Sequence, residues 1–147
     1  MRLLVILMLL ARVAAAHQSS TKYVDIRIDG DRADVTLRCI PGDVTEPMKL
    51  APDAKPSVAA AAAAPTVPAY VASWLALRVP TENGPVTCTA RDPRARGEDD
   101  GFLAVTWSVT CAQPIEILIL DFSAFFTLDK RMEALVRIVI WGRRAEW

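Results

Sequence analysis

The sequence predicts a mainly β protein in which an antiparallel β-sandwich follows a cleavable signal peptide. Segments that alternate apolar and polar residues recur along the chain, as half-buried strands do. Turn signals such as Asp29-Gly30 and Asn83-Gly84 separate those segments. The first residues combine a basic start, an apolar stretch and small residues, which is the pattern of an export signal.

The leader is predicted to span residues 1–16. Its apolar stretch is 3–10, and Ala14 and Ala16 occupy the small positions that a signal peptidase reads. A stretch of that length is too short for a stable membrane anchor, which needs about 20 residues, although an uncleaved anchor or a buried helix is the alternative. Cleavage leaves 17–147 as one exported domain, periplasmic or extracellular, with no transmembrane helix.

The first two strands are predicted at 22–28 and 33–40, joined by a type I′ turn at Asp29-Gly30. Each strand has one apolar face. The apolar residues of the two strands are Val24, Ile26, Ile28, Val35, Leu37 and Cys39. Such a hairpin needs another layer to cover its apolar face.

A helical insertion is predicted over about 56–78. Pro56-Ser57 can start a short helix through the alanine run, and Pro65 would stop it. A second helical piece follows from 68 to 77, with Trp74 and Leu75 expected to be buried.

The second half of the chain returns to strand patterns. Strands are predicted at 86–90 and 102–111, separated by a solvated polar loop at 91–101. The segment 115–121 is apolar on both faces and is expected at the centre of its sheet, and the last strand is predicted at 133–141. Six or seven strands with a helical insertion favour an immunoglobulin-like β-sandwich.

Three cysteines would leave the cytosol with this domain. An oxidising compartment permits one disulfide and one remaining thiol. Of the three possible pairings Cys88–Cys111 is favoured, because each lies on a strand-like stretch beside the loop 91–101. Cys39 continues the apolar face of its strand and is interpreted as a buried small residue, with a metal-binding thiolate as the alternative.

The protein is predicted not to be an enzyme. Its one histidine, His17, lies at the predicted mature N-terminus, so a serine or cysteine nucleophile would have no histidine base in the folded domain. Phosphate-binding glycine motifs and the GxSxG motif are absent from the sequence. Basic and acidic residues number 17 each, and without a basic patch there is no case for nucleic acid as a partner.

His17 is the candidate metal ligand. After cleavage, its free α-amine and its imidazole could chelate one ion together, and nitrogen ligands suit Ni(II), Cu(II) or Zn(II). Further ligands would be needed, and the candidates are the soft Met48, Met132 and Cys39 and the hard Asp25 and Asp43. The alternative is that His17 merely follows the cleavage site in a terminal tail.

The sequence resembles the N-terminal extracytoplasmic domain of the HupE/UreJ family of bacterial membrane proteins. The matching features are "AH" at the export junction, "DIRIDGDRADVTLRCIPGDVTEP", "VPAYVASWLAL", "NGPVTC", "DDGFLAVTWSVTC" and "LDKRMEALVRI". The family implies hydrogenase or urease accessory proteins and permeases for nickel or related metals, whose transport function lies in a following bundle of transmembrane helices. That bundle is missing here, and a histidine often found near the position of Met132 is absent.

The sequence thus predicts a non-enzymatic accessory domain of a metal-uptake system, with Ni or Cu bound through His17. The alternative is an interaction module without a metal role, which would dock on an envelope or membrane protein. Its docking residues would be Trp141, Trp147 or the proline-rich segment.

Overall fold

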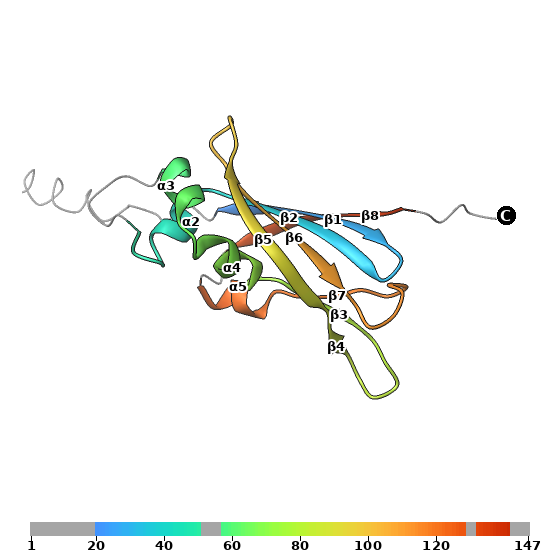
Figure 1. Ribbon diagram of the computed structural model, residues 1–147. Helices are drawn as coiled ribbons and strands as arrows, with labels where there is room; N and C mark the ends of the chain where they lie inside the picture. The colour runs from blue at the N-terminus through green and yellow to red at the C-terminus, as the bar shows by residue number, and fades with distance from the viewer. Residues whose placement is uncertain (1–19, 51–56, 129–131, 142–147) are drawn as a thin grey trace, which may run out of the picture.

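The computed structural model describes residues 20–50, 57–128 and 132–141, and it is mainly β with two sheets (Figure 1). The described strands and helices, in chain order, are β1 (Thr21–Asp29), β2 (Arg32–Cys39), α2 (Gly42–Thr45), α3 (Val58–Ala63), α4 (Val67–Ala72), β3 (Ala76–Val79), β4 (Val86–Thr87), β5 (Thr89–Gly97), β6 (Leu103–Thr110), β7 (Ile119–Asp121), α5 (Ser123–Leu128) and β8 (Glu133–Ile140). The large sheet has the order β5-β6-β2-β1-β8 and the small sheet the order β4-β3-β7. The prediction of a mainly β, sandwich-like fold is confirmed. The predicted leader 1–16, His17 and Trp147 lie outside the described residues.

The β1–β2 hairpin follows the predicted alternation, and its inward side chains are buried. Its turn differs from the prediction. Asp29 pairs with Arg32, so the loop residues are Gly30 and Asp31. Only Gly30 has a positive φ, at 61°, which is the requirement of a type II′ turn rather than type I′.

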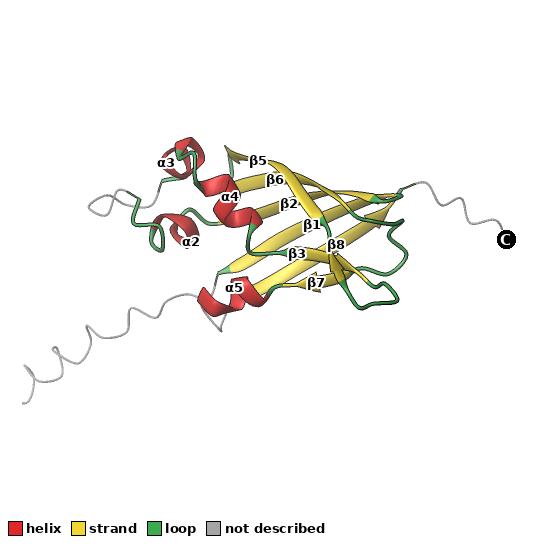
Figure 2. Cartoon of the chain, turned by 60° about the horizontal axis from the view of Figure 1, so that its bottom comes forward, coloured by secondary structure: helices red, strands yellow, loops and turns green. Residues whose placement is uncertain are grey.

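The strand pairing is antiparallel except at one place. β8 runs parallel to β1, from Thr21 opposite Glu133 to Ile28 opposite Ile140. The prediction of a wholly antiparallel sandwich is therefore wrong for this pair. The reason is the return of the chain through β7 and α5 to the end of the sheet where β1 begins (Figures 1 and 2).

The predicted helical insertion at 56–78 is only partly helical. Two short helices, α3 and α4, fill its first part, and Ser57 caps α3 by accepting a hydrogen bond from the backbone N–H of Ala60. Residues 76–79 form strand β3, so the predicted helix over 68–77 ends too late. Leu75, Leu77 and Val79 alternate into the core, a period of two that the helical spacing of Val71, Trp74 and Leu75 obscured.

Two further predictions about strands are wrong. The loop predicted at 91–101 is mostly strand β5, which lies at the edge of the large sheet and shows no apolar alternation because its side chains are largely exposed. The segment 115–121, predicted as a central strand, contains only the three-residue edge strand β7. Its apolar residues do not all face the core, since Ile115 is buried and Ile117 is exposed.

The core lies between the large sheet and a second layer that covers only part of it. Helices α3 and α4 pack against β5 and β6, and the helices gather at one end of the sheet (Figure 2). Phe125 of α5 packs edge-to-face on Trp74 and is fully buried. None of the helices in the described ranges is long and apolar enough to span a bilayer.

Candidate functional site

The disulfide joins the two predicted cysteines and connects the two sheets. The Cys88 and Cys111 sulfurs are bonded, and their Cα atoms lie 4.3 Å apart. The Cys88 N–H donates to the carbonyl of Leu77 in β3, and the Cys111 N–H donates to the carbonyl of Asp31 in the first hairpin, both at 2.8 Å. The bridge therefore fastens the small sheet to the turn end of the large one.

Cys39 is a free, buried thiol beside a buried charge pair. Burial first, and then the carboxylate of Asp43, raise the pKa of Cys39 to about 12, although the ammonium of Lys22 lowers it somewhat. The thiol is therefore protonated at neutral pH, whereas metal binding requires the thiolate. This geometry favours the interpretation of Cys39 as a small core residue.

Lys22 is the residue in this neighbourhood that the sequence pattern did not single out. It shares the inward face of Val24, and its side chain is 0% exposed. Its ammonium lies 2.8 Å from the Asp43 carboxylate, donates to the carbonyl and hydroxyl of Ser20, and lies 5.7 Å from the ring centre of Phe125. A fully buried ammonium needs such a set of acceptors.

The candidate metal ligands do not form a centre within the described ranges, where no three His, Cys, Asp or Glu side chains come together to hold an ion. Asp43 is engaged by Lys22 and by the Ser20 hydroxyl, which donates to both carboxylate oxygens at 2.7 and 2.8 Å. Asp25 is paired with Arg137 on the other face of the sheet. Met48 and Met132 are half-buried against the core.

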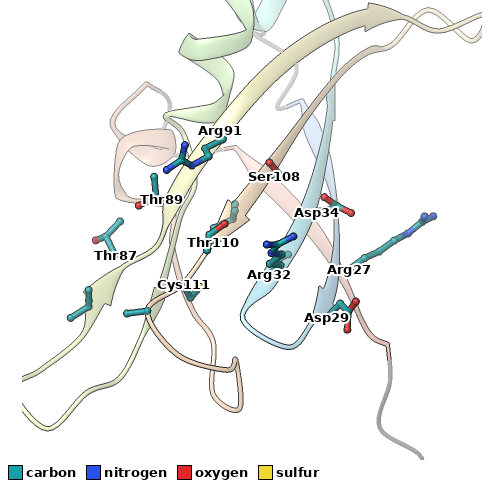
Figure 3. Close-up of a pocket in the computed structure, with 14 residues that line it drawn as sticks. Arg27, Asp29, Arg32, Asp34, Thr87, Thr89, Arg91, Ser108, Thr110 and Cys111 are labelled. Atoms are coloured by element: carbon teal, nitrogen blue, oxygen red, sulfur yellow. The ribbon is translucent and has the colours of Figure 1, made fainter.

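The outer face of the large sheet is a polar hollow of about 850 Å³ (Figure 3). Opposite charges lie next to each other across β1 and β2, where Arg27 is opposite Asp34 and Asp29 is opposite Arg32. In Figure 3 the side chains of Arg27 and Arg91 extend away from the centre of the hollow, on opposite sides. Because these two guanidinium groups diverge and Arg27 lies opposite Asp34, the hollow is a polar face rather than a converging binding site.

The β8 edge is the most unusual surface of the described chain. Its inward residues continue the core face of β1, and three of them, Val136, Ile138 and Ile140, are 38%, 46% and 58% exposed. The exposed large apolar residues of β8 and its end are Leu135, Val136, Ile138, Val139, Ile140 and Trp141. Leu135 is 59% exposed, Ile140 58% and Trp141 70%. Several exposed large apolar side chains on one strand make β8 the candidate interaction site.

The backbone of β8 is also available on its outer side. The N–H of Trp141 donates to the carbonyl of Ile28 at 2.8 Å. Since peptide groups of alternate residues in a strand point to opposite sides, the odd-numbered residues bond to β1. The N–H and C=O groups of Ala134, Val136, Ile138 and Ile140 then face the open edge, beyond which the described residues place no further strand.

The opposite edge of the same sheet, β5, has the features that prevent pairing. It carries Arg91, Arg94 and Arg96, and its register with β6 is interrupted between Arg91 and Arg94. Within that bulge Asp92 has a φ of 53°, and Pro93 has no N–H to donate. Charges, bulges and proline are the means by which natural sheets protect their edges.

A small apolar hollow of about 270 Å³ lies at the end of β8. Ile28, Pro114, Ile115, Ile140 and Trp141 are among its lining residues. It provides space for one apolar side chain next to the open edge.

The sequence named Trp141 as a docking residue but missed the rest of the edge. Apolar residues on both faces usually indicate a central strand, and only the sheet order shows that β8 has a single neighbour among the strands of the described residues. Neither the comparison with protein-family models nor the comparison with curated proteins returned a match for this chain.

Proposed function

We propose that this protein is an exported, non-enzymatic interaction module that binds an extended segment of a partner protein along the open edge of β8. One observation carries the proposal, namely the contrast between the charged, bulged β5 edge and the regular, apolar β8 edge of the same sheet. Long apolar edges pair readily with other chains, so monomeric proteins blunt them. An edge that retains its pairing capacity is the place where a partner strand binds.

The binding mode is strand addition. A partner segment would bond to the outward N–H and C=O groups of β8 and pack its side chains beside the exposed apolar ones. Backbone hydrogen bonds provide affinity in this mode, and the alternate side chains provide specificity.

Two proline variants distinguish the loss of pairing at the open edge from the loss of the β1–β8 pairing within the fold. Ile138→Pro removes an N–H that faces the open edge, so we expect the β1–β8 ladder to remain. The control variant, Val139→Pro, removes an N–H that faces β1, so we expect it to lose stability. Both effects are measured by urea unfolding of the full chain.

The functional test uses a photo-crosslinking residue at position 135 of β8, compared with the same residue at position 94 of β5, in cells that produce the full chain. We expect a discrete adduct from position 135 that disappears in the Ile138→Pro background. An equal adduct from position 94, or one from position 135 that Ile138→Pro leaves unchanged, would overturn the proposal.

Export and an immunoglobulin-like arrangement of the sheets belong to the same proposal. The Cys88–Cys111 bond supports a periplasmic or extracellular location, because disulfides persist in oxidising compartments. Intact-mass measurement of the exported protein should give a chain that begins at His17. A retained leader would contradict this part of the proposal.

The resemblance to the HupE/UreJ family adds an accessory role in metal uptake, with Ni or Cu bound by His17. Calorimetric titration of the processed protein with Cu(II) and Ni(II), repeated on His17→Ala, tests that role. Equal weak binding by both proteins would remove the metal role without affecting the proposal for β8.

A further inference from the structure

We infer that the strand bound by β8 comes from a different protein, is apolar on both faces, and carries one acidic residue opposite Arg137. This inference rests on the function proposed above and specifies the chemistry of the partner. It follows from three features of β8: the position of its one arginine, the remaining donors of that arginine, and the apolar side chains around it.

The position of Arg137 disfavours a second copy of this chain as the occupant. Two copies of β8 that pair around a two-fold axis must be antiparallel, with one residue opposite its own copy. Arg137 is the middle residue of 133–141, so the longest pairing places it opposite the second Arg137. Because its N–H and C=O face β1, the two residues would form a non-hydrogen-bonded pair, in which side chains are closest. Like charges directly opposite each other destabilise a sheet.

Pairings centred on another residue avoid this contact, but each residue by which the centre moves away from Arg137 shortens the paired segment by two residues. They also leave part of the apolar edge uncovered, which removes the benefit of pairing. A single basic residue in the middle of an apolar edge therefore acts against self-association, as edge charges do in other sheets.

The same arginine can select a partner. Its Nε donates to the Asp25 carboxylate, and its side chain is 69% exposed. A guanidinium has five N–H donors, so one monodentate contact leaves several free for a second carboxylate. An Asp or Glu opposite Arg137 on the added strand would accept them. A Lys or Arg in that place would be repelled.

The remaining positions require apolar side chains. On the inner face, Val136, Ile138 and Ile140 leave apolar surface exposed, and on the outer face Leu135 and Val139 flank Arg137. Near Ile140 the hollow beside Trp141 and Pro114 has room for one large apolar side chain of the partner. The partner strand is thus complementary to β8, which is itself apolar on both faces with one central charge.

The test uses two synthetic nine-residue peptides that are apolar on both faces, built from valine and isoleucine, and that differ only in a central Glu or Lys. Calorimetric titration of the full chain should show roughly tenfold tighter binding of the Glu peptide, the difference between an attractive and a repulsive cross-strand pair. Arg137→Glu should reverse the preference. Hydrogen exchange of the Val136 and Ile138 amides places the bound peptide on β8.

Equal binding of both peptides to β8, unchanged by Arg137→Glu, would overturn this inference and leave strand binding intact. If neither peptide binds or protects those amides, the proposed function fails with it. Sedimentation provides an independent readout. We expect the wild-type chain and Arg137→Lys to be monomeric and Arg137→Leu to dimerise. A wild-type dimer that Ile138→Pro dissociates would show that the occupant is a second copy.

Discussion

Replacement of Asp43 by asparagine should be among the most destabilising single changes in this protein, because it leaves the Lys22 ammonium buried without a counter-charge. The Lys22 side chain is fully buried and that of Asp43 nearly so, and the two groups lie 2.8 Å apart. Removal of one partner of a buried ion pair costs about 3–5 kcal/mol, since the remaining charge stays desolvated. The only other oxygens bonded to this ammonium, in the described residues, belong to Ser20.

A double-mutant cycle isolates this effect. Asp43→Asn, Lys22→Met and the double variant are compared by urea unfolding with a common m-value. Lys22→Met should cost less than Asp43→Asn, because the Asp43 carboxylate keeps both hydrogen bonds from Ser20 and methionine fills the same space over Phe125. The double variant should recover most of the loss, with a coupling energy of about 2–3 kcal/mol.

A cost of less than about 1 kcal/mol for Asp43→Asn, which is the range of an exposed ion pair, would contradict a desolvated Lys22 ammonium. That result would mean that the ammonium reaches water by a small movement of the side chain. Equal costs for both single variants with no coupling would refute the pairing itself.

Three further predictions concern the cysteines and one close contact. The Cys88→Ala/Cys111→Ala variant should lose about 3 kcal/mol of its free energy of unfolding, measured in urea, because the bridge closes a loop with a sequence separation of 23 and so restricts the unfolded chain. An unchanged urea midpoint would contradict this prediction. Burial raises the pKa of Cys39 from 9.0 to about 12, so the folded state holds the thiol proton more tightly than the unfolded state does. The free energy of unfolding, relative to that of Cys39→Ala, should therefore fall as the pH rises above 9, by about 1.4 kcal/mol per pH unit. A difference between the two proteins that does not change with pH would contradict this prediction. Gly97→Ala should lower the free energy of unfolding by about 1–3 kcal/mol, because a Cβ at this position would lie 2.5 Å from Val58 Cγ1. If this clash is the cause, the same substitution made in a Val58→Ala background should lose less stability.

The parts of the fold that the sequence predicted are those in which one face of a strand is buried. β1, β2 and β6 alternate cleanly because neighbouring strands flank them on both sides and the second layer covers one face. The Cys88–Cys111 pairing followed from the same patterns, since the cysteines lie where β5 begins and where β6 ends.

The parts that failed depend on position within a sheet, which periodicity does not encode. β5 looks like a loop because an edge strand with exposed side chains has no apolar alternation, and its bulge interrupts whatever period remains. β3 is hidden within a predicted helix because Leu75 fits both the helical spacing with Val71 and Trp74 and the period of two with Leu77 and Val79. The sequence pattern does not single out Lys22, because nothing local shows that Asp43 lies beside it in space.

The bulge at Asp92 and Pro93 limits the size of any assembly built on this protein. A sheet able to recruit strands at both sides could elongate without end, copy upon copy, into a filament. Under the binding mode proposed for β8, each copy of the protein offers one pairing edge, so copies cannot join to one another at both sides of the sheet. The complex should therefore be discrete, with one bound segment for each copy of the protein.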